Sequence, residues 1–145
     1  MKFLTKKFFD RLGKKAFKMY KAWIWSKQMD VKGNKFIRYK EPYGSLKRAN
    51  KLKRQSAASS ASRAPILTGD FKNDLIFKGA STNGFTFSWN SRGARVNHLA
   101  DMKRVVTSKD TPLPRDVTME IDRQVLREIK RKQGKSKTHK IVLGK

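Results

Sequence analysis

The residue pair best suited to catalysis in this sequence is His98 with Asp101. An imidazole and a carboxylate can transfer a proton or activate a nucleophile when they lie within hydrogen-bond reach. An Asp three residues after a His is also common on helix surfaces and in turns, and no Ser, Cys or Lys nucleophile stands in a recognisable motif. We therefore expect no catalytic residue and no enzymatic activity.

Sites for cofactors and metals are not indicated either. The spacing of Gly69, Gly79, Gly84 and Gly93 matches neither the dinucleotide-binding nor the P-loop pattern. The chain has two histidines and no cysteine, so it lacks the ligands of a zinc site and cannot form a disulfide framework. We expect no cofactor, no bound metal and no small-molecule substrate.

The charge of the chain indicates an acidic partner. Its 145 residues include 36 Lys and Arg against 11 Asp and Glu, a net charge of +25. Residues 1–54 carry 18 basic and 3 acidic residues, residues 55–129 carry 11 and 8, and residues 130–145 carry 7 and none. A nearly balanced centre between two basic ends is typical of a folded domain with arms that bind nucleic acid or acidic protein surfaces.

The N-terminal residues, from Phe3 to about Trp25, have the spacing of one helical face. Apolar side chains recur every four residues and lysines fill the other face: Leu4, Phe8, Leu12, Ala16, Tyr20 and Ile24. Such a basic amphipathic helix can lie on a membrane, but a lone surface helix would not explain the folded-looking remainder, so we expect it to pack in a core or against a subunit, with no membrane contact. Basic residues interrupt the apolar positions too often for an export signal or a membrane span.

Two indoles flank Ile24 in this helix. Side chains two residues apart on a helix point about 200° apart. Trp23 and Trp25 therefore should not both enter one core, and we expect one of them to be an exposed interface anchor.

A hairpin and a second helix are predicted further along. Residues 75–78 and 85–89 alternate on either side of an Asn83-Gly84 turn, with Phe85, Phe87 and Trp89 on one core-facing side. From about Leu113 to Lys132, apolar residues recur every four positions between an acidic start and a basic finish, which is typical of a helix that Gly134 can close. Another strand is expected near residues 104–107.

These elements predict an α+β fold in which an N-terminal and a C-terminal helix cover a small antiparallel sheet. We expect one domain over residues 1–134, a flexible basic loop at about 47–63, and a basic tail at 135–145. The candidate residues for interfaces or polyanion binding are Trp23, Trp25, Lys47, Arg48, Lys51, Lys53, Arg54, Arg115, Lys130, Arg131 and Lys132.

Four short segments stand in a definite order along the chain. They are the Pro-x-Gly segment in residues 34–46, the segment Pro65-Ile66-Leu67-Thr68-Gly69-Asp70-Phe71, the segment Val96-Asn97-His98-Leu99, and the step Pro112-Leu113-Pro114-Arg115. In this order around the expected hairpin, they are similar to the virion-morphogenesis and tail-completion proteins of long-tailed bacteriophages. Two positions differ from that family, since no aromatic residue precedes His98, and Asp116-Val117 follows Arg115.

The resemblance implies a structural protein of the virion neck or tail end that forms a ring without catalysis. It implies contacts with copies of itself and with connector, tail-tube or terminator proteins, and possible non-specific contact with DNA. The charge alone leaves open a different class, an RNA-binding protein of the ribosomal kind, whose basic ends would thread between phosphates.

Overall fold

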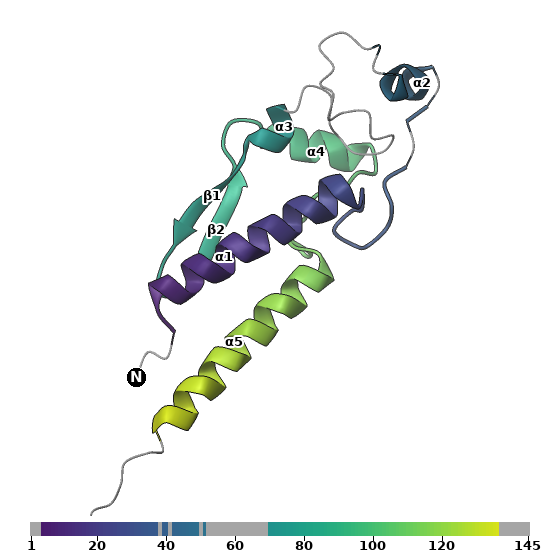
Figure 1. Cartoon of the computed structure of the whole chain (residues 1–145). Helices are drawn as coiled ribbons and strands as arrows, with labels where there is room; N and C mark the ends of the chain where they lie inside the picture. Colours follow the sequence, from purple (N-terminus) through teal and green to yellow (C-terminus); the bar gives the residue numbers. More distant parts are fainter. Residues whose placement is uncertain (1–3, 38, 41, 50, 52–69, 137–145) are drawn as a thin grey trace, which may run out of the picture.

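The chain folds as α+β in the computed structural model, which describes residues 4–37, 39–40, 42–49, 51 and 70–136 (Figure 1). The elements are α1 (Lys6–Lys21), the π-helical turn η1 (Ala22–Ser26), α2 (Tyr43–Arg48), α3 (Asp70–Asn73), β1 (Leu75–Ala80), β2 (Phe85–Trp89), α4 (Ala94–Asp101) and α5 (Arg115–Ser136). The predicted fold class is confirmed. No helix among the described residues combines the length and apolar character that crossing a bilayer requires.

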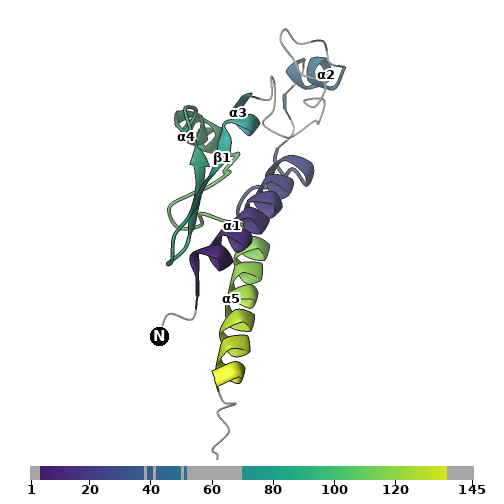
Figure 2. The ribbon, with the colours of Figure 1, turned by 60° about the vertical axis from the view of Figure 1, so that its left-hand side comes forward.

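Helix α1 is the centre of the molecule. It packs against both strands of the hairpin and against α5, so that the hairpin, α1 and α5 form successive layers (Figures 1 and 2). The hydroxyl of Thr5 caps the start of α1 by accepting a hydrogen bond of 3.2 Å from the backbone N–H of Phe8. The predicted periodicity is confirmed, because the buried residues of α1 lie along one face: Phe8, Phe9, Leu12, Gly13, Ala16 and Tyr20.

The predicted hairpin is present and its two strands pair in an antiparallel register. Leu75 lies opposite Trp89 and Phe77 opposite Phe87, while Lys78 has no opposite residue and forms a bulge. The bulge restores the alternation after the extra residue, so that Ala80 lies opposite Phe85. The apolar side of the hairpin therefore stays turned toward α1 along its whole length.

Gly13 allows α1 and the hairpin to approach closely. A Cβ atom at this position would lie 2.6 Å from Phe77 Cε2 and 2.6 Å from Phe85 Cγ. Aromatic rings on the hairpin continue the contact along α1, since the ring of Phe87 lies 5.5 Å from those of Phe17 and Tyr20. The core aromatic residues predicted from the alternation are thus confirmed.

Both indoles of the first helix are buried, so the expectation of one exposed anchor is wrong. Trp23 is 8% exposed and Trp25 is 3% exposed. After η1 the chain turns back, and Trp23 Nε1 donates to the carbonyl of Asp30 at 2.8 Å. Phe71 packs against Trp25 at 6.5 Å between ring centroids. The core surrounds this end of the helix, because residues 29–36 and α3 cover it along with the hairpin.

Asp74 fixes the base of the hairpin to the segment that begins α4. Its carboxylate accepts hydrogen bonds from the hydroxyl of Ser91 at 2.7 Å and from the backbone N–H of Arg92 at 2.8 Å. These hydrogen bonds lower the pKa of the Asp74 carboxyl, and the one from the Ser91 side chain has the largest effect.

Three expectations about boundaries are corrected. Residues 104–107 form no strand, since Val105 contributes one backbone hydrogen bond, from the N–H of Val31, and the described sheet has two strands. Helix α5 is present as predicted but continues through Gly134 to Ser136, so the glycine does not close it and the tail does not begin at 135. The expected loop at 47–63 begins inside α2, and its residues 50 and 52–63 lie outside the described part of the chain.

Candidate polyanion-binding groove

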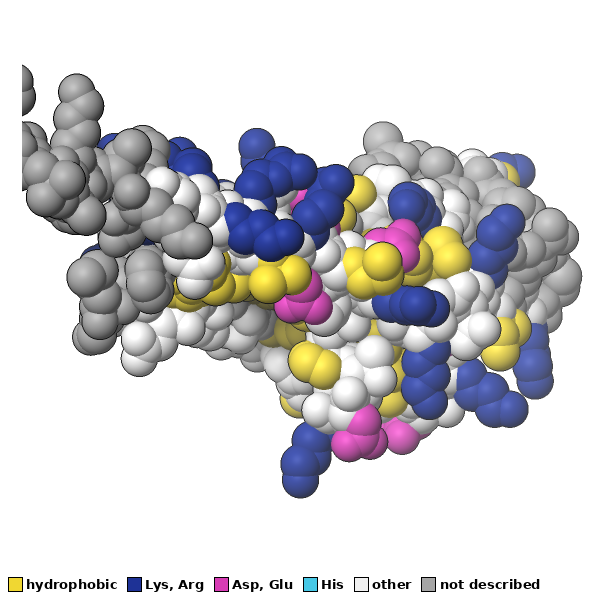
Figure 3. Space-filling view, turned by 90° about the horizontal axis from the view of Figure 1, so that it is seen from below, with side chains coloured by type: hydrophobic (Ala, Val, Ile, Leu, Met, Phe, Trp, Pro, Cys, Tyr) yellow, Lys and Arg dark blue, Asp and Glu magenta, His cyan; other side chains and the backbone are white. Residues whose placement is uncertain are grey.

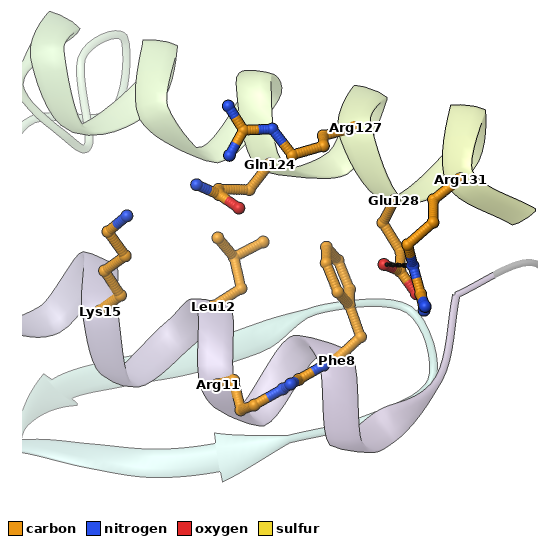
Figure 4. Close-up of a pocket in the computed structure, with 8 residues that line it drawn as sticks. All are labelled: Phe8, Arg11, Leu12, Lys15, Gln124, Arg127, Glu128 and Arg131. Atoms are coloured by element: carbon orange, nitrogen blue, oxygen red, sulfur yellow. Dashed lines mark hydrogen bonds and ion pairs between the residues drawn. The ribbon is translucent and has the colours of Figure 1, made fainter.

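A groove of about 280 Å³ runs between α1 and α5 (Figure 4). Its lining comes from both helices: Phe8, Arg11, Leu12 and Lys15 from α1, and Gln124, Arg127, Glu128 and Arg131 from α5. Phe8 and Leu12 point from α1 toward α5 and form an apolar floor. Four of the eight lining side chains are cations and one is an anion, so the groove is positively charged.

The packing of α5 onto α1 creates this groove. Val117 is 1% exposed, and Ile121 and Val125 pack against the cluster formed by Phe8 and Leu12. Residues four apart lie on one helix face, so this apolar row is held against α1 while the next side chains around α5 flank the groove.

Two acidic residues of α5 organise part of the charge. Glu120 accepts hydrogen bonds from Lys15 Nζ at 2.5 Å and from Gln124 Nε2 at 2.8 Å, and it also pairs with Arg123. The hydrogen bond from Lys15 is the largest cause of its low pKa, which falls from 4.5 to about 2. Lys15 is therefore already engaged in holding α1 and α5 together.

Glu128 engages a second cation. Arg131 donates to it through Nε at 2.9 Å and Nη2 at 2.7 Å, a two-point contact that lowers the pKa of the Glu128 carboxyl. The charge of the more distant Arg11 also lowers this pKa. One edge of the Arg131 guanidinium is therefore occupied by the Glu128 carboxylate of the same helix.

Arg11 and Arg127 are the uncommitted cations of the groove. Both are exposed, and neither makes a hydrogen bond or an ion pair within the described residues. They come from different helices and both line the groove, where each can contact an anion. The site can bind phosphate or carboxylate groups without sequence-specific contacts.

The structure brings together only part of the predicted set. Arg131 lines the groove, Lys130 is exposed on the same helix, and Lys132 lies 4.0 Å from Glu128. Arg115 is exposed at the start of α5, away from the groove lining.

The predicted cations of the first basic region are placed elsewhere or not described. Lys47 and Arg48 end α2, Lys51 is exposed, and Lys53 and Arg54 lie outside the described residues. The groove cations that the predicted set did not include are Arg11, Lys15 and Arg127. The sequence indicated only that these residues belong to the basic faces of two helices. Nothing in it indicated that the two faces lie side by side.

The two residues considered first for catalysis lie on one helix. His98 and Asp101 are both exposed on α4, and no hydrogen bond or ion pair joins them in the described structure. The described residues also contain no group of three or more side chains placed to hold a metal ion.

Basic side chains are also numerous on the face of the molecule seen from below (Figure 3). Viewed from below, Lys and Arg outnumber Asp and Glu and lie around a row of exposed apolar side chains (Figure 3). Comparison with protein-family models, with curated proteins and with solved structures finds no match to this chain.

Proposed function

We propose that the chain is a structural subunit of a bacteriophage virion, located at the head-tail junction or at the tail end, and that it assembles into a ring by protein contacts. Two of the segments that carry the resemblance lie where helices begin. Pro114 is buried directly before α5, and Asp70 begins α3 before the hairpin. In this role the protein acts by binding its neighbours and not by catalysis.

The observation that carries the proposal is the outward face of α5. Met119 is 56% exposed and Leu126 is 57% exposed, although both are large apolar residues. They are seven residues apart, so they share one face of a helix whose opposite side packs on α1. Exposed apolar residues grouped on one face mark an interaction surface.

Light scattering coupled to size-exclusion chromatography tests the assembly. We expect a mass of several subunits at moderate salt, and rings in negative-stain images. Changing Met119→Gln together with Leu126→Gln should shift the mass toward one subunit, because the apolar contact is lost. Ile76→Thr is the matched control, since Ile76 is 36% exposed on β1 and should leave the mass unchanged. A wild-type protein that is a monomer at tens of micromolar would contradict the proposal.

The genes beside the reading frame test the phage assignment separately. Genes for portal, capsid and tail-tube proteins alongside it are expected. A ribosomal operon at that place would rule the virion role out.

The groove favours a second candidate, an RNA-binding protein of the ribosomal kind. The uncommitted Arg11 and Arg127 are suited to backbone phosphates, and contacts of this type bind RNA and DNA alike. Electrophoretic mobility with ribosomal and total RNA across a salt series separates the two functions. Salt-resistant preference for one RNA supports the second candidate, whereas weak binding that vanishes at moderate salt supports the first.

A further inference from the structure

The loop of the hairpin contains an asparagine directly followed by a glycine. The strands pair as far as Ala80 opposite Phe85, so residues 81–84 connect them. Asn83 is exposed and Gly84 is half-buried. Neither has a positive φ angle, whereas both would have one in the two-residue turn that Asn-Gly usually forms. The backbone conformation of this loop therefore does not require a glycine.

The backbone nitrogen of Gly84 is free to react. An asparagine loses ammonia when the backbone nitrogen of the next residue attacks the carbon of its side-chain amide. The attack is fastest when that nitrogen makes no hydrogen bond and no side chain crowds it. The N–H of Gly84 makes no hydrogen bond within the described residues. A Cβ added at Gly84 would meet no atom within 4 Å, so the space around this residue is open.

The side chain of Asn83 is held only weakly. The hydroxyl of Thr82 donates to its Oδ1 across 3.4 Å, which is long for a hydrogen bond of this type. The Nδ2 group, which must leave as ammonia, makes no hydrogen bond to the described residues. The side chain can therefore rotate toward the nitrogen of Gly84.

At two other asparagines, the nitrogen that would attack is already engaged. Asn73 is followed by Asp74, whose backbone N–H donates to the carbonyl of Asp70 at 2.8 Å. Asn90 is followed by Ser91, whose backbone N–H donates to the carboxylate of Asp74 at 3.0 Å. An attack at either position would first have to break a hydrogen bond.

Two more asparagines are restrained in other ways. Asn34 donates from Nδ2 to Oδ2 of Asp30 at 3.2 Å, so its side chain is fixed. Asn97 lies within α4, where helical hydrogen bonds occupy the backbone N–H that follows it. Among the described asparagines, Asn83 alone combines a free side-chain amide with a free nitrogen in the next residue.

We propose that Asn83 is a site of spontaneous deamidation. The nitrogen of Gly84 bonds to Cγ of Asn83, the bond between Cγ and Nδ2 breaks, and the proton of the Gly84 N–H leaves with Nδ2 as ammonia. The product is a cyclic imide, which a water molecule opens. Breaking the bond from nitrogen to Cγ gives aspartate. Breaking the bond from nitrogen to the main-chain carbonyl carbon gives isoaspartate, in which the main chain runs through Cβ.

The modification changes the hairpin in two ways. Both products add a negative charge to the exposed loop of a strongly basic chain. Isoaspartate also lengthens the main chain of the loop by a carbon atom, directly beside the last strand pair, Ala80 and Phe85. The inference does not depend on the proposed function.

Incubation of the folded protein at mildly alkaline pH, followed by peptide mass spectrometry, tests the proposal. We expect Asn83 to convert at least about tenfold faster than Asn73 and Asn90, whose following nitrogens are hydrogen-bonded. A free peptide with the sequence of residues 78–88 is the reference, and the folded protein should convert within about tenfold of its rate. Stronger protection in the folded protein would overturn the proposal, because the loop would then shield the site.

Gly84→Ala tests the route through the imide. The added methyl group fits the loop but crowds the attacking nitrogen, so conversion of Asn83 should slow at least about fivefold. Gly93→Ala is the matched control, since its Cβ also meets nothing within 4 Å, and it should leave the rate unchanged. Circular dichroism checks that both variants fold. An unchanged rate in Gly84→Ala, an equal fall in the control, or aspartate as the only product would overturn this route.

Discussion

The hydroxyl of Tyr20 donates a hydrogen bond of 2.6 Å to the backbone carbonyl of Val106, 86 residues further along the chain. Both residues are almost fully buried. The bond fixes the last turn of α1 to the segment between α4 and α5, where no sheet holds the backbone in place. Burial raises the pKa of the Tyr20 hydroxyl well above its usual value of 10, so the donor keeps its proton throughout the physiological range.

Replacing this donor should destabilise the fold. Tyr20→Phe removes the hydroxyl and leaves the buried carbonyl of Val106 unpaired, which should lower the free energy of unfolding by about 1–2 kcal/mol. Urea unfolding monitored by circular dichroism measures the change. Tyr43→Phe, at an exposed position, is the control and should change stability by less than about 0.5 kcal/mol. Equal effects of the two substitutions would show that the hydrogen bond contributes little.

Two glycines in helices should respond in opposite ways to alanine. Gly13→Ala places a Cβ against the rings of Phe77 and Phe85, so we expect a loss of about 1–3 kcal/mol despite the better helix propensity of alanine. Gly134→Ala meets nothing within 4 Å and should gain up to about 1 kcal/mol. Urea unfolding of both variants measures the difference. A stabilising Gly13→Ala would show that α1 and the hairpin do not approach as closely as described.

The contact between Lys15 and Glu120 should make stability depend on pH in the acidic range. The pKa of Glu120 is about 2 in the folded chain against 4.5 ordinarily, so its stabilising effect is complete above about pH 4.5 and is lost as the pH falls toward 2. Glu120→Gln should therefore destabilise the protein at neutral pH and flatten the fall in melting temperature between about pH 5 and pH 3. Asp110→Asn, at an exposed site, is the control and should keep the wild-type profile. A wild-type profile for Glu120→Gln would exclude this coupling.

The groove cations should account for part of the binding to nucleic acid. Arg11→Gln with Arg127→Gln should weaken binding to a short DNA duplex and reduce the slope of log affinity against log salt by about 2, roughly one for each phosphate contact. Fluorescence anisotropy over a salt series measures both quantities. Lys32→Gln with Lys109→Gln removes the same charge from exposed positions outside the groove. Equal losses in the two double variants would mean that net charge, and not the groove, governs binding.

The elements with strong local patterns could be predicted from the sequence. The alternation around Asn83-Gly84 and the four-residue repeats of the two long helices are properties of short segments, and the structure contains all three elements. The β-branched residues Val105 and Val106 indicated a strand for the same local reason. They instead fill the core next to Val31 without a neighbouring strand to pair with.

Features that depend on distant contacts could not be predicted. The burial of Trp25 requires Phe71, which lies far along the chain, and helical geometry alone suggested exposure. The groove requires α5 to pack on α1 so that Arg11 and Arg127 line the same space. The sequence showed two basic helical faces, but their relative placement is set by Ile121, Val125 and the residues they contact.

Helix α5 is held to the body mainly by its first half, through Val117, Ile121 and Val125, and extends well beyond those contacts. Its 22 residues give it a length of about 33 Å. With that length, a tilt of about 10° around its first turn would displace its far end by roughly 6 Å. In the proposed ring, a small repacking of α5 against α1 would therefore be enough to fit the same subunit to neighbours arranged on circles of different diameter.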